Sequence, residues 1–121
     1  MADKKKRRSF EETQQKGDCA VTKEKKIYHG WRDQLTRDTH VTANGVDLRH
    51  VGTHSKTLEW GYSGSGPSDL AWSILADYLG DEEQAFQLHH QFKRHFVTGF
   101  GEWEWTLSAE QIESWLKQPT R

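Results

Sequence analysis

The residues of this sequence best suited to chemistry are its seven histidines, because imidazole binds transition metals and transfers protons near neutral pH. His50 and His54 have the spacing that places two ligands on one face of a helix, but Gly52 lies between them and the stretch reads as a loop. His89 and His90 are adjacent and project about 100° apart on a helix, which argues against a shared ion. There is no His-Glu-x-x-His motif and no cysteine in the same part of the chain. The sequence therefore predicts no metal ion and no cofactor.

A glycine-rich passage, Trp-Gly-Tyr-Ser-Gly-Ser-Gly-Pro at residues 60–67, is the second candidate, since such turns before a helix bind phosphate through free amides. The spacing argues against a phosphate loop, because no Gly-Lys-Ser/Thr ends it and no third glycine completes the dinucleotide pattern. Asp69 is expected in the first turn of the following helix, where it already supplies the negative charge that the helix dipole favours. We therefore expect the glycines to permit a tight turn between strand and helix.

Nucleophilic catalysis requires a serine, cysteine or threonine beside a base. Ser63, Ser65 and Ser68 flank the glycine-rich passage, but none has the Gly-x-Ser-x-Gly spacing of a nucleophile elbow. Glu82 and Glu83 open an expected helix, where capping and the helix dipole account for their charge. The sequence predicts a protein that is not an enzyme, and an enzyme with an unrecognised site is kept as an alternative.

Acidic and aromatic residues alternate at positions 102–105 and form the best candidate for a contact with another protein. Tryptophan is enriched at the centres of protein interfaces, and flanking carboxylates attract a basic surface. The competing interpretation is that these tryptophans pack into an aromatic-rich core. The predicted partner-binding residues are Glu82, Glu83, Glu102, Trp103, Glu104 and Trp105.

Charge divides the chain into two parts. Residues 1–26 hold nine Lys or Arg against five Asp or Glu, a net charge of +4, whereas residues 27–121 hold eight against thirteen, a net charge of −5. An acidic folded part suits a basic protein surface better than nucleic acid, because binding to phosphate needs clustered cations. The residues predicted to contact nucleic acid or an acidic partner are Lys4, Lys5, Lys6, Arg7 and Arg8.

The single cysteine, Cys19, excludes a disulfide framework and fits a reducing compartment. No apolar run approaches the ~20 residues of a membrane span, and no apolar signal segment follows the basic start. We therefore expect a cytoplasmic protein that does not bind a membrane. Residues 1–25 have no periodic apolar pattern and are expected to form a flexible basic tail ahead of a single domain at residues 26–121.

The strongest local signal for structure is an Asn-Gly pair at residues 44–45, which is favoured in the two-residue turn of a β-hairpin. Further strands are predicted at residues 27–31 and 58–62, and a weaker pattern indicates one at residues 103–105. The hairpin register places four apolar residues on one face, where the helices are expected to cover them. These four are Val41, Ala43, Val46 and Leu48.

Three helices are expected after the first strands. They span residues 66–80, with a glycine at the end, residues 81–97, with an aspartate at the start, and a third segment that begins at the capping box of residues 108–111. Strands followed by helices indicate an α+β fold. The predicted domain is a small antiparallel sheet of three strands, or four with residues 103–105, packed against three helices.

The order of these motifs resembles a family of small domains of unknown function, and the resemblance covers nearly all of residues 27–117. It rests on Glu59-Trp60-Gly61-Tyr62-x-Gly64-x-Gly66-Pro67, Leu70-Ala71, Ile74-Leu75-Ala76, Gly80, Ala85, Phe92-Lys93, Trp105-Thr106-Leu107 and Trp115-Leu116. Such domains occur in bacteria and on phages and plasmids. The resemblance implies no catalytic residues and favours a small protein-binding module that blocks host defence machinery such as CRISPR-Cas. An accessory protein that binds nucleic acid through the basic tail is the alternative.

Overall fold

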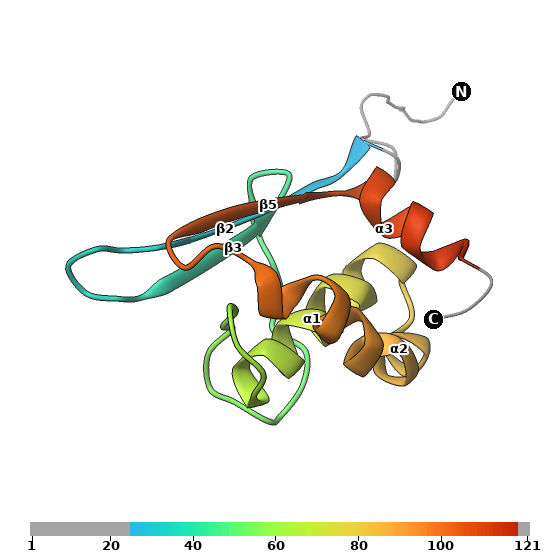
Figure 1. Ribbon diagram of the computed structural model, residues 1–121, viewed down its shortest axis with the longest axis horizontal. Helices are drawn as coiled ribbons and strands as arrows, with labels where there is room; N and C mark the ends of the chain where they lie inside the picture. Colours follow the sequence, from blue (N-terminus) through green and yellow to red (C-terminus); the bar gives the residue numbers. More distant parts are fainter. Residues whose placement is uncertain (1–24, 119–121) are drawn as a thin grey trace, which may run out of the picture.

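The computed structural model describes residues 25–118, which form a four-stranded antiparallel sheet and three α-helices (Figure 1). The strands are β2 (Ile27–Arg32), β3 (Thr39–Ala43), β4 (Val46–Asp47) and β5 (Glu104–Ser108), in the order β4-β3-β2-β5. The helices are α1 (Ser65–Leu79), α2 (Glu82–His95) and α3 (Ala109–Leu116), and a short 3-10 turn, η2, spans Val97–Gly99. The predicted α+β class is confirmed.

The sheet and the helices form two layers. Figure 1 shows the sheet along one side of the molecule, with α1 and α2 beneath it and α3 at the end of β5. No helix within residues 25–118 covers the opposite side of the sheet, which we call the outer face. Because alternate residues of a strand point to opposite sides, pairing of the strands fixes which residues share this face. They are His29, Trp31, His40, Thr42, Glu104 and Thr106.

The core between the two layers is dominated by aromatic contacts. The Trp60 and Trp105 rings meet edge to face with centroids 5.6 Å apart, and Phe100 stacks on Trp105 at 4.1 Å. At the other end of the core, Trp115 of α3 meets Phe92 of α2 edge to face at 5.4 Å. Such large side chains bury much area each, which compensates for the low apolar fraction of the sequence. The aliphatic side chains packed with them include Leu70, Ile74, Leu75, Leu107 and Ile112, all nearly or fully buried.

The predicted hairpin forms with the predicted register. Asn44 and Gly45 have φ of 52° and 83°, as a type I′ turn requires, and the turn pairs β3 with β4. Val41 and Leu48 are buried beneath the sheet, in agreement with the prediction. The prediction for Val46 is wrong, since its side chain is 70% exposed. The reason is its position beside the turn in a two-residue strand at the edge of the sheet.

The strand predicted at residues 58–62 is wrong, whereas the weaker pattern at residues 103–105 overlaps β5, which begins at Glu104 and continues to Ser108. Residues 58–62 form a loop that joins no sheet and bends at Gly61 and Tyr62. Trp60 is buried there, and the backbone N–H of Gly61 donates to the carbonyl of Val97 at 3.0 Å. The apolar pattern that predicted a strand therefore reflects the burial of Trp60 in a loop, and not pairing with another strand.

The helix ends follow the predicted capping residues. Gly80 ends α1 in the left-handed conformation with φ of 71°. The Asp81 carboxylate accepts hydrogen bonds from two backbone N–H groups at the start of α2. At α3, Ser108 and Gln111 form a complete capping box. The second helix ends at His95, two residues earlier than predicted, because the chain tightens into η2.

Candidate functional site

Aromatic rings form a row on the outer face of the sheet. Trp31 stacks between His29, at a centroid distance of 4.9 Å, and His40, at 5.1 Å. His29 Nε2 lies 2.6 Å from Oε2 of Glu104 on the neighbouring strand β5. These side chains meet because β2 pairs with β3 on one side and with β5 on the other. The pairing therefore produces a half-exposed surface of mixed aromatic and charged character.

The loop that joins β2 to β3 is fixed by its own hydrogen bonds. The Asp33 carboxylate accepts from the backbone N–H groups of Thr36 and Leu35 at 2.9 and 2.8 Å, and these bonds lower the pKa of Asp33 below its ordinary value. The Asp33 N–H donates to the carbonyl of Asp38, and the Arg37 N–H donates to the carbonyl of Asp33, each at 2.9 Å. The side chain of Leu35 is 94% exposed. A fixed loop thus displays a large apolar side chain.

A cleft of about 480 Å³ opens beside this loop. On its wall, the Arg32 guanidinium lies 2.9 Å from Oε1 of Glu59 and 5.0 Å from the centroid of the Trp60 ring. The Arg37 guanidinium lies over the ring of Trp103 at 5.5 Å and forms no ion pair with any residue in the range 25–118. We call residues 33–38 together with Trp103 the sheet tip.

Carboxylates outnumber free cations at the sheet tip. Arg37 is the exposed cation, whereas Arg32 is largely buried and neutralised by Glu59. The exposed carboxylates in the tip or next to it in the chain are those of Asp33, Asp38, Glu102 and Glu104. The tip therefore combines an apolar centre with an acidic surround.

A second region is centred on a buried carboxylate. Asp69 of α1 is fully buried, and its oxygens accept hydrogen bonds from ring nitrogens of His50 and His54, each at 2.8 Å. The backbone N–H groups of His54 and Ser55 also donate to it, at 3.2 and 3.0 Å. Burial by itself would raise the pKa of Asp69, but the bonds from His50, His54 and the two amides outweigh it and hold the pKa below its ordinary value. Asp69 is therefore ionised at neutral pH and fastens the loop to α1.

Two expectations about this region change. Asp69 does not lie in the first turn of its helix, because α1 begins at Ser65, and the side chain points inward. Residues 50–54 do form a loop, yet the loop brings both histidines to one carboxylate. Gly52 makes this possible, since its φ is 113° and a Cβ at this position would lie 2.4 Å from Oδ1 of Asp69.

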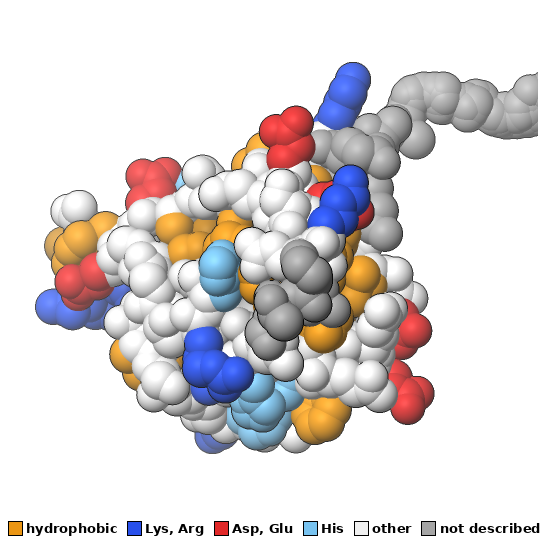
Figure 2. All heavy atoms as spheres, turned by 45° about the vertical axis from the view of Figure 1, so that its right-hand side comes forward, with side chains coloured by type: hydrophobic (Ala, Val, Ile, Leu, Met, Phe, Trp, Pro, Cys, Tyr) orange, Lys and Arg blue, Asp and Glu red, His pale blue; other side chains and the backbone are white. Residues whose placement is uncertain are grey.

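Further rings surround His54 and form what we call the histidine cluster. The His54 ring stacks against the ring of His89, with centroids 6.1 Å apart, and lies 6.0 Å from Trp72. His89 is fully buried, its Nδ1 donates to the carbonyl oxygen of Phe86, and burial lowers its pKa. The ring of His90 lies 4.0 Å from that of His89, so neighbouring histidines meet despite their angular separation on the helix. In Figure 2, histidine side chains gather next to hydrophobic ones at the lower edge of the molecule.

Two findings limit what residues 25–118 contain. No group of three or more His, Cys, Asp or Glu in this range is arranged to hold a metal ion. No helix in the same range is long and apolar enough to cross a membrane.

Comparison with known protein families matches residues 28–118 to a family of unknown function, DUF6166. The chain belongs to this family. The match includes all three helices and every strand apart from the first residue of β2. No curated protein and no solved structure matches the chain. The predicted resemblance to a family of small domains of unknown function is thereby confirmed.

In the DUF6166 domain, the residues predicted to bind a partner do not lie on one surface. Trp103 is 38% exposed at the sheet tip, and Glu102 and Glu104 are exposed on either side of it. Trp105 is 6% exposed and packs in the core between Trp60 and Phe100, so it is not available to a partner. For Trp105 the core interpretation is therefore the correct one.

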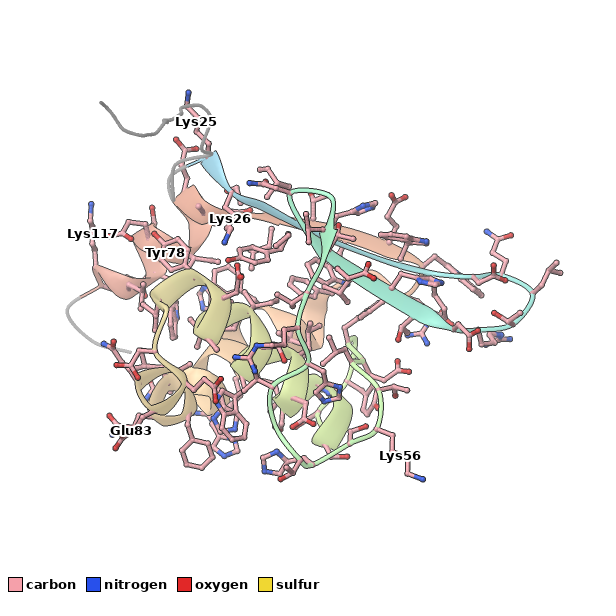
Figure 3. The ribbon with its side chains drawn as sticks, turned by 180° about the vertical axis from the view of Figure 1, so that it is seen from behind. Lys25, Lys26, Lys56, Tyr78, Glu83 and Lys117 are labelled. Atoms are coloured by element: carbon pink, nitrogen blue, oxygen red, sulfur yellow. The ribbon has the colours of Figure 1, made fainter. Side chains whose placement is uncertain are left out.

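The remaining acidic residues lie elsewhere. Figure 3 places Glu83 at the end of the helical layer farthest from the sheet. Glu82, beside it, forms an ion pair with Arg49, and its carbonyl accepts a hydrogen bond from Trp72 Nε1. Glu82 and Glu83 therefore do not share a surface with the sheet tip. The predicted contact residues Lys4, Lys5, Lys6, Arg7 and Arg8 lie outside the described residues.

Little in the sequence marked the region around Asp69. Its members are spread over residues 50, 54, 69 and 89, so no fixed spacing joins them. One signal was available: Asp69 directly precedes the apolar residues Leu70 and Ala71 in a predicted helix whose inward face is mostly apolar. A lone acidic residue on a buried helix face requires partners from another element.

Proposed function

We propose that this DUF6166 domain is a protein-binding module that uses the sheet tip to hold a basic surface of another protein. The observation that carries the proposal is Leu35, which is 94% exposed on a loop whose backbone is held by hydrogen bonds to Asp33. A loop that is ordered before binding loses less conformational entropy when it binds. Tryptophan and arginine are enriched among the residues that carry binding energy at protein interfaces, and Trp103 and Arg37 lie together in the same tip, 5.5 Å from guanidinium to ring centroid.

The charge around the anchor indicates the chemistry of the partner. Asp33, Asp38, Glu102 and Glu104 are exposed in or beside the tip, against the single free guanidinium of Arg37. Carboxylates at the rim of an interface speed the encounter with a basic surface and select against acidic ones. The partner we propose has an apolar pocket for Leu35 and a rim of Lys or Arg.

A narrower hypothesis is that the module inhibits host defence machinery such as CRISPR-Cas. It rests on the resemblance drawn from the sequence, which implies that similar domains occur on phages and plasmids. Expression of the chain in a host with an active CRISPR-Cas system tests it, because an inhibitor restores plaque formation by a targeted phage. Unchanged interference would remove this hypothesis and leave the wider proposal standing.

The alternative of a nucleic-acid-associated protein rests on the basic run Lys4–Arg8. An affinity for DNA or RNA that falls steeply with salt would support it. Removal of residues 1–24 should then abolish that affinity, whereas the same truncation should leave binding through the sheet tip intact.

The test of the main proposal compares three baits in pull-downs from the native host. They are the wild type, Leu35→Asp, and Val46→Asp as a matched control, because Val46 is also an exposed aliphatic residue of the sheet. The partner is expected on the wild type and the control and not on Leu35→Asp. Binding kinetics with the purified partner should then show a loss of affinity of about tenfold or more for Leu35→Asp. A partner held equally by all three baits contradicts the proposal.

A further inference from the structure

Strand β5 lies at one end of the sheet and has a side without a partner. The strand order is β4-β3-β2-β5, so β5 pairs with β2 and with no other strand in residues 25–118. The opposite edge of the sheet ends in β4, a strand of two residues, whereas β5 has five. An edge strand that is neither short nor covered is open to pairing with another chain. We call the unpaired side of β5 the free edge.

The pairing of β2 with β5 fixes which backbone groups point to the free edge. Just before β5, the carbonyl of Trp103 accepts a hydrogen bond from the Arg32 N–H at 2.9 Å. Residues that bond to the partner strand alternate with residues that do not, so Trp105 also bonds to β2. Glu104 and Thr106 direct their N–H and C=O groups the other way. These groups form no hydrogen bond with any residue between 25 and 118.

The residues that carry these groups are open to solvent. Glu104 and Thr106 are both exposed, and the Glu104 side chain is 66% exposed although its carboxylate contacts His29. Gly101 lies beside the carbonyl of Glu104, where a Cβ would be 3.0 Å from the carbonyl oxygen. A side chain at this position would crowd the carbonyl, so the glycine keeps it accessible to another backbone.

A cleft of about 320 Å³ adjoins the end of the free edge. Its lining includes Ser108, the last residue of β5, together with residues from the end of α2 and from α3. Phe96 and Trp115 supply aromatic rings to this lining, with centroids 6.3 Å apart. An apolar side chain gains from burial against such rings. When a segment adds to the edge of a sheet, backbone hydrogen bonds give affinity and pockets for side chains give specificity.

We propose that the free edge binds an extended segment of another protein as an additional strand. The outward N–H and C=O groups of Glu104 and Thr106 are spaced to bond to an extended backbone. A Lys or Arg of the segment lies beside the Glu104 carboxylate, since opposite charges on neighbouring strands attract. An apolar residue of the segment enters the cleft at Phe96. The free edge does not include Leu35, so this inference goes beyond the function proposed for the sheet tip and does not depend on it.

The test screens a displayed library of random peptides against the full chain, and then compares the retained peptides on two variants. Thr106→Pro removes an N–H that points to the free edge and no bond between β5 and β2, whereas Thr106→Val keeps that N–H. Peptides with a basic and an apolar residue are expected to bind Thr106→Val as they bind the wild type, and Thr106→Pro at least about tenfold more weakly. Leu35→Asp should bind them as the wild type does, which separates this test from that of the sheet tip.

A proline in β5 is open to a local distortion that would mimic lost binding. Amide hydrogen exchange in the wild type avoids this difficulty, because it needs no substitution. A bound peptide should slow exchange at Glu104 and Thr106 at least about tenfold, since both amides gain an acceptor. Exchange at Trp105, whose amide already bonds to β2, should change little.

Four results would overturn the proposal. If no retained peptide distinguishes Thr106→Pro from Thr106→Val, or if exchange at Glu104 and Thr106 is unchanged, the free edge takes no segment. If the wild type is a dimer in sedimentation and Thr106→Pro is a monomer, the free edge pairs with a second copy of the chain. If peptides bind only after removal of residues 1–24, the chain's own first residues occupy the edge.

Discussion

The sheet tip and the loop around Asp69 are each organised by one aspartate, but the two carboxylates work over different ranges. Asp33 accepts hydrogen bonds from amides two and three residues further along the chain, and it lies in solvent. Asp69 accepts from groups fourteen to nineteen residues earlier, and it is fully buried. The first carboxylate shapes a loop, whereas the second joins a loop to a helix.

The difference determines what each region contributes. Water competes for the hydrogen bonds of Asp33, so they order the loop and add little to the stability of the domain. The Asp69 carboxylate is itself buried, although its histidine partners are partly exposed, so a loss at this position removes several hydrogen bonds that water replaces less well. We therefore expect the sheet tip to tolerate substitution and serve binding, and the Asp69 region to serve the fold.

The largest expected effect is the loss of Asp69. Asp69→Ala leaves two imidazole N–H groups and two amides without their acceptor, and we expect it to lower the free energy of unfolding by about 3 kcal/mol. Asp33→Ala, the matched substitution at the sheet tip, should change it far less. Urea denaturation of both variants measures the contrast. Equal losses would show that burial does not distinguish the two carboxylates.

The glycines of the two regions give the next largest effect. Gly52 and Gly45 both have positive φ, 113° and 83°, but a Cβ on Gly52 meets Asp69 at 2.4 Å, whereas a Cβ on Gly45 meets open space. Gly52→Ala should cost about 2 kcal/mol or more, from backbone strain and steric conflict together, and Gly45→Ala only about 1 kcal/mol, from backbone strain alone. Thermal melting of the two variants checks the order. A smaller loss at Gly52 would mean that the loop moves away from Asp69 at little cost.

These two regions also show how far sequence reasoning reaches. The hairpin, the helix caps and β5 were predictable, because a turn pair, a capping box and alternating residues act over a few positions. The exposed Trp103 was found for the same reason. Trp105 was assigned to the wrong surface, because strand alternation does not say which face meets the helices. The contacts of Asp69 were missed because tertiary packing, and no local spacing, brings His50 and His54 to it.

Tyr28 extends the comparison to a buried hydroxyl in the sheet. Its side chain is fully buried and donates to Oδ2 of Asp77 at 2.7 Å, and burial, followed by the hydrogen bond to Asp77, raises the pKa of Tyr28 above its ordinary value. The neutral phenol is thus favoured in the folded state. Stability should be fully present below the unfolded pKa of about 10 and fall as the pH rises above it, by up to about 1.4 kcal/mol per pH unit.

Melting temperatures between about pH 8 and pH 11 measure this slope. Tyr28→Phe should be less stable at neutral pH, because it loses the hydrogen bond, and should lose less stability in alkali. Tyr62→Phe is the matched control, since Tyr62 is 50% exposed and should leave the slope unchanged. If Tyr62→Phe, and not Tyr28→Phe, reduced the fall in melting temperature at high pH, the loss of stability in alkali would not come from the buried Tyr28.

The smallest expected effect on stability, and the sharpest on binding, comes from charge reversal at the sheet tip. Glu102→Lys with Glu104→Lys replaces two exposed carboxylates and breaks the hydrogen bond between Glu104 and His29. Exposed pairs contribute little, so the double variant should unfold within about 1 kcal/mol of the wild type. Association with a basic partner should slow and lose much of its dependence on salt, because the carboxylates that attract the partner are reversed.

Glu83→Lys with Glu110→Lys is the matched control, since it makes the same change in net charge at exposed positions away from the tip. Association rates at low and high salt separate two cases. If charge at the sheet tip guides the partner, only the Glu102→Lys, Glu104→Lys variant associates slowly at low salt. At high salt the wild type and both double variants should associate at similar rates. If both double variants are slowed equally, the net charge of the domain attracts the partner. The carboxylates around Leu35 would then not explain why a particular partner is chosen. The two double substitutions differ in location and not in charge. The ratio of the two variants' association rates therefore isolates the contribution of the sheet tip.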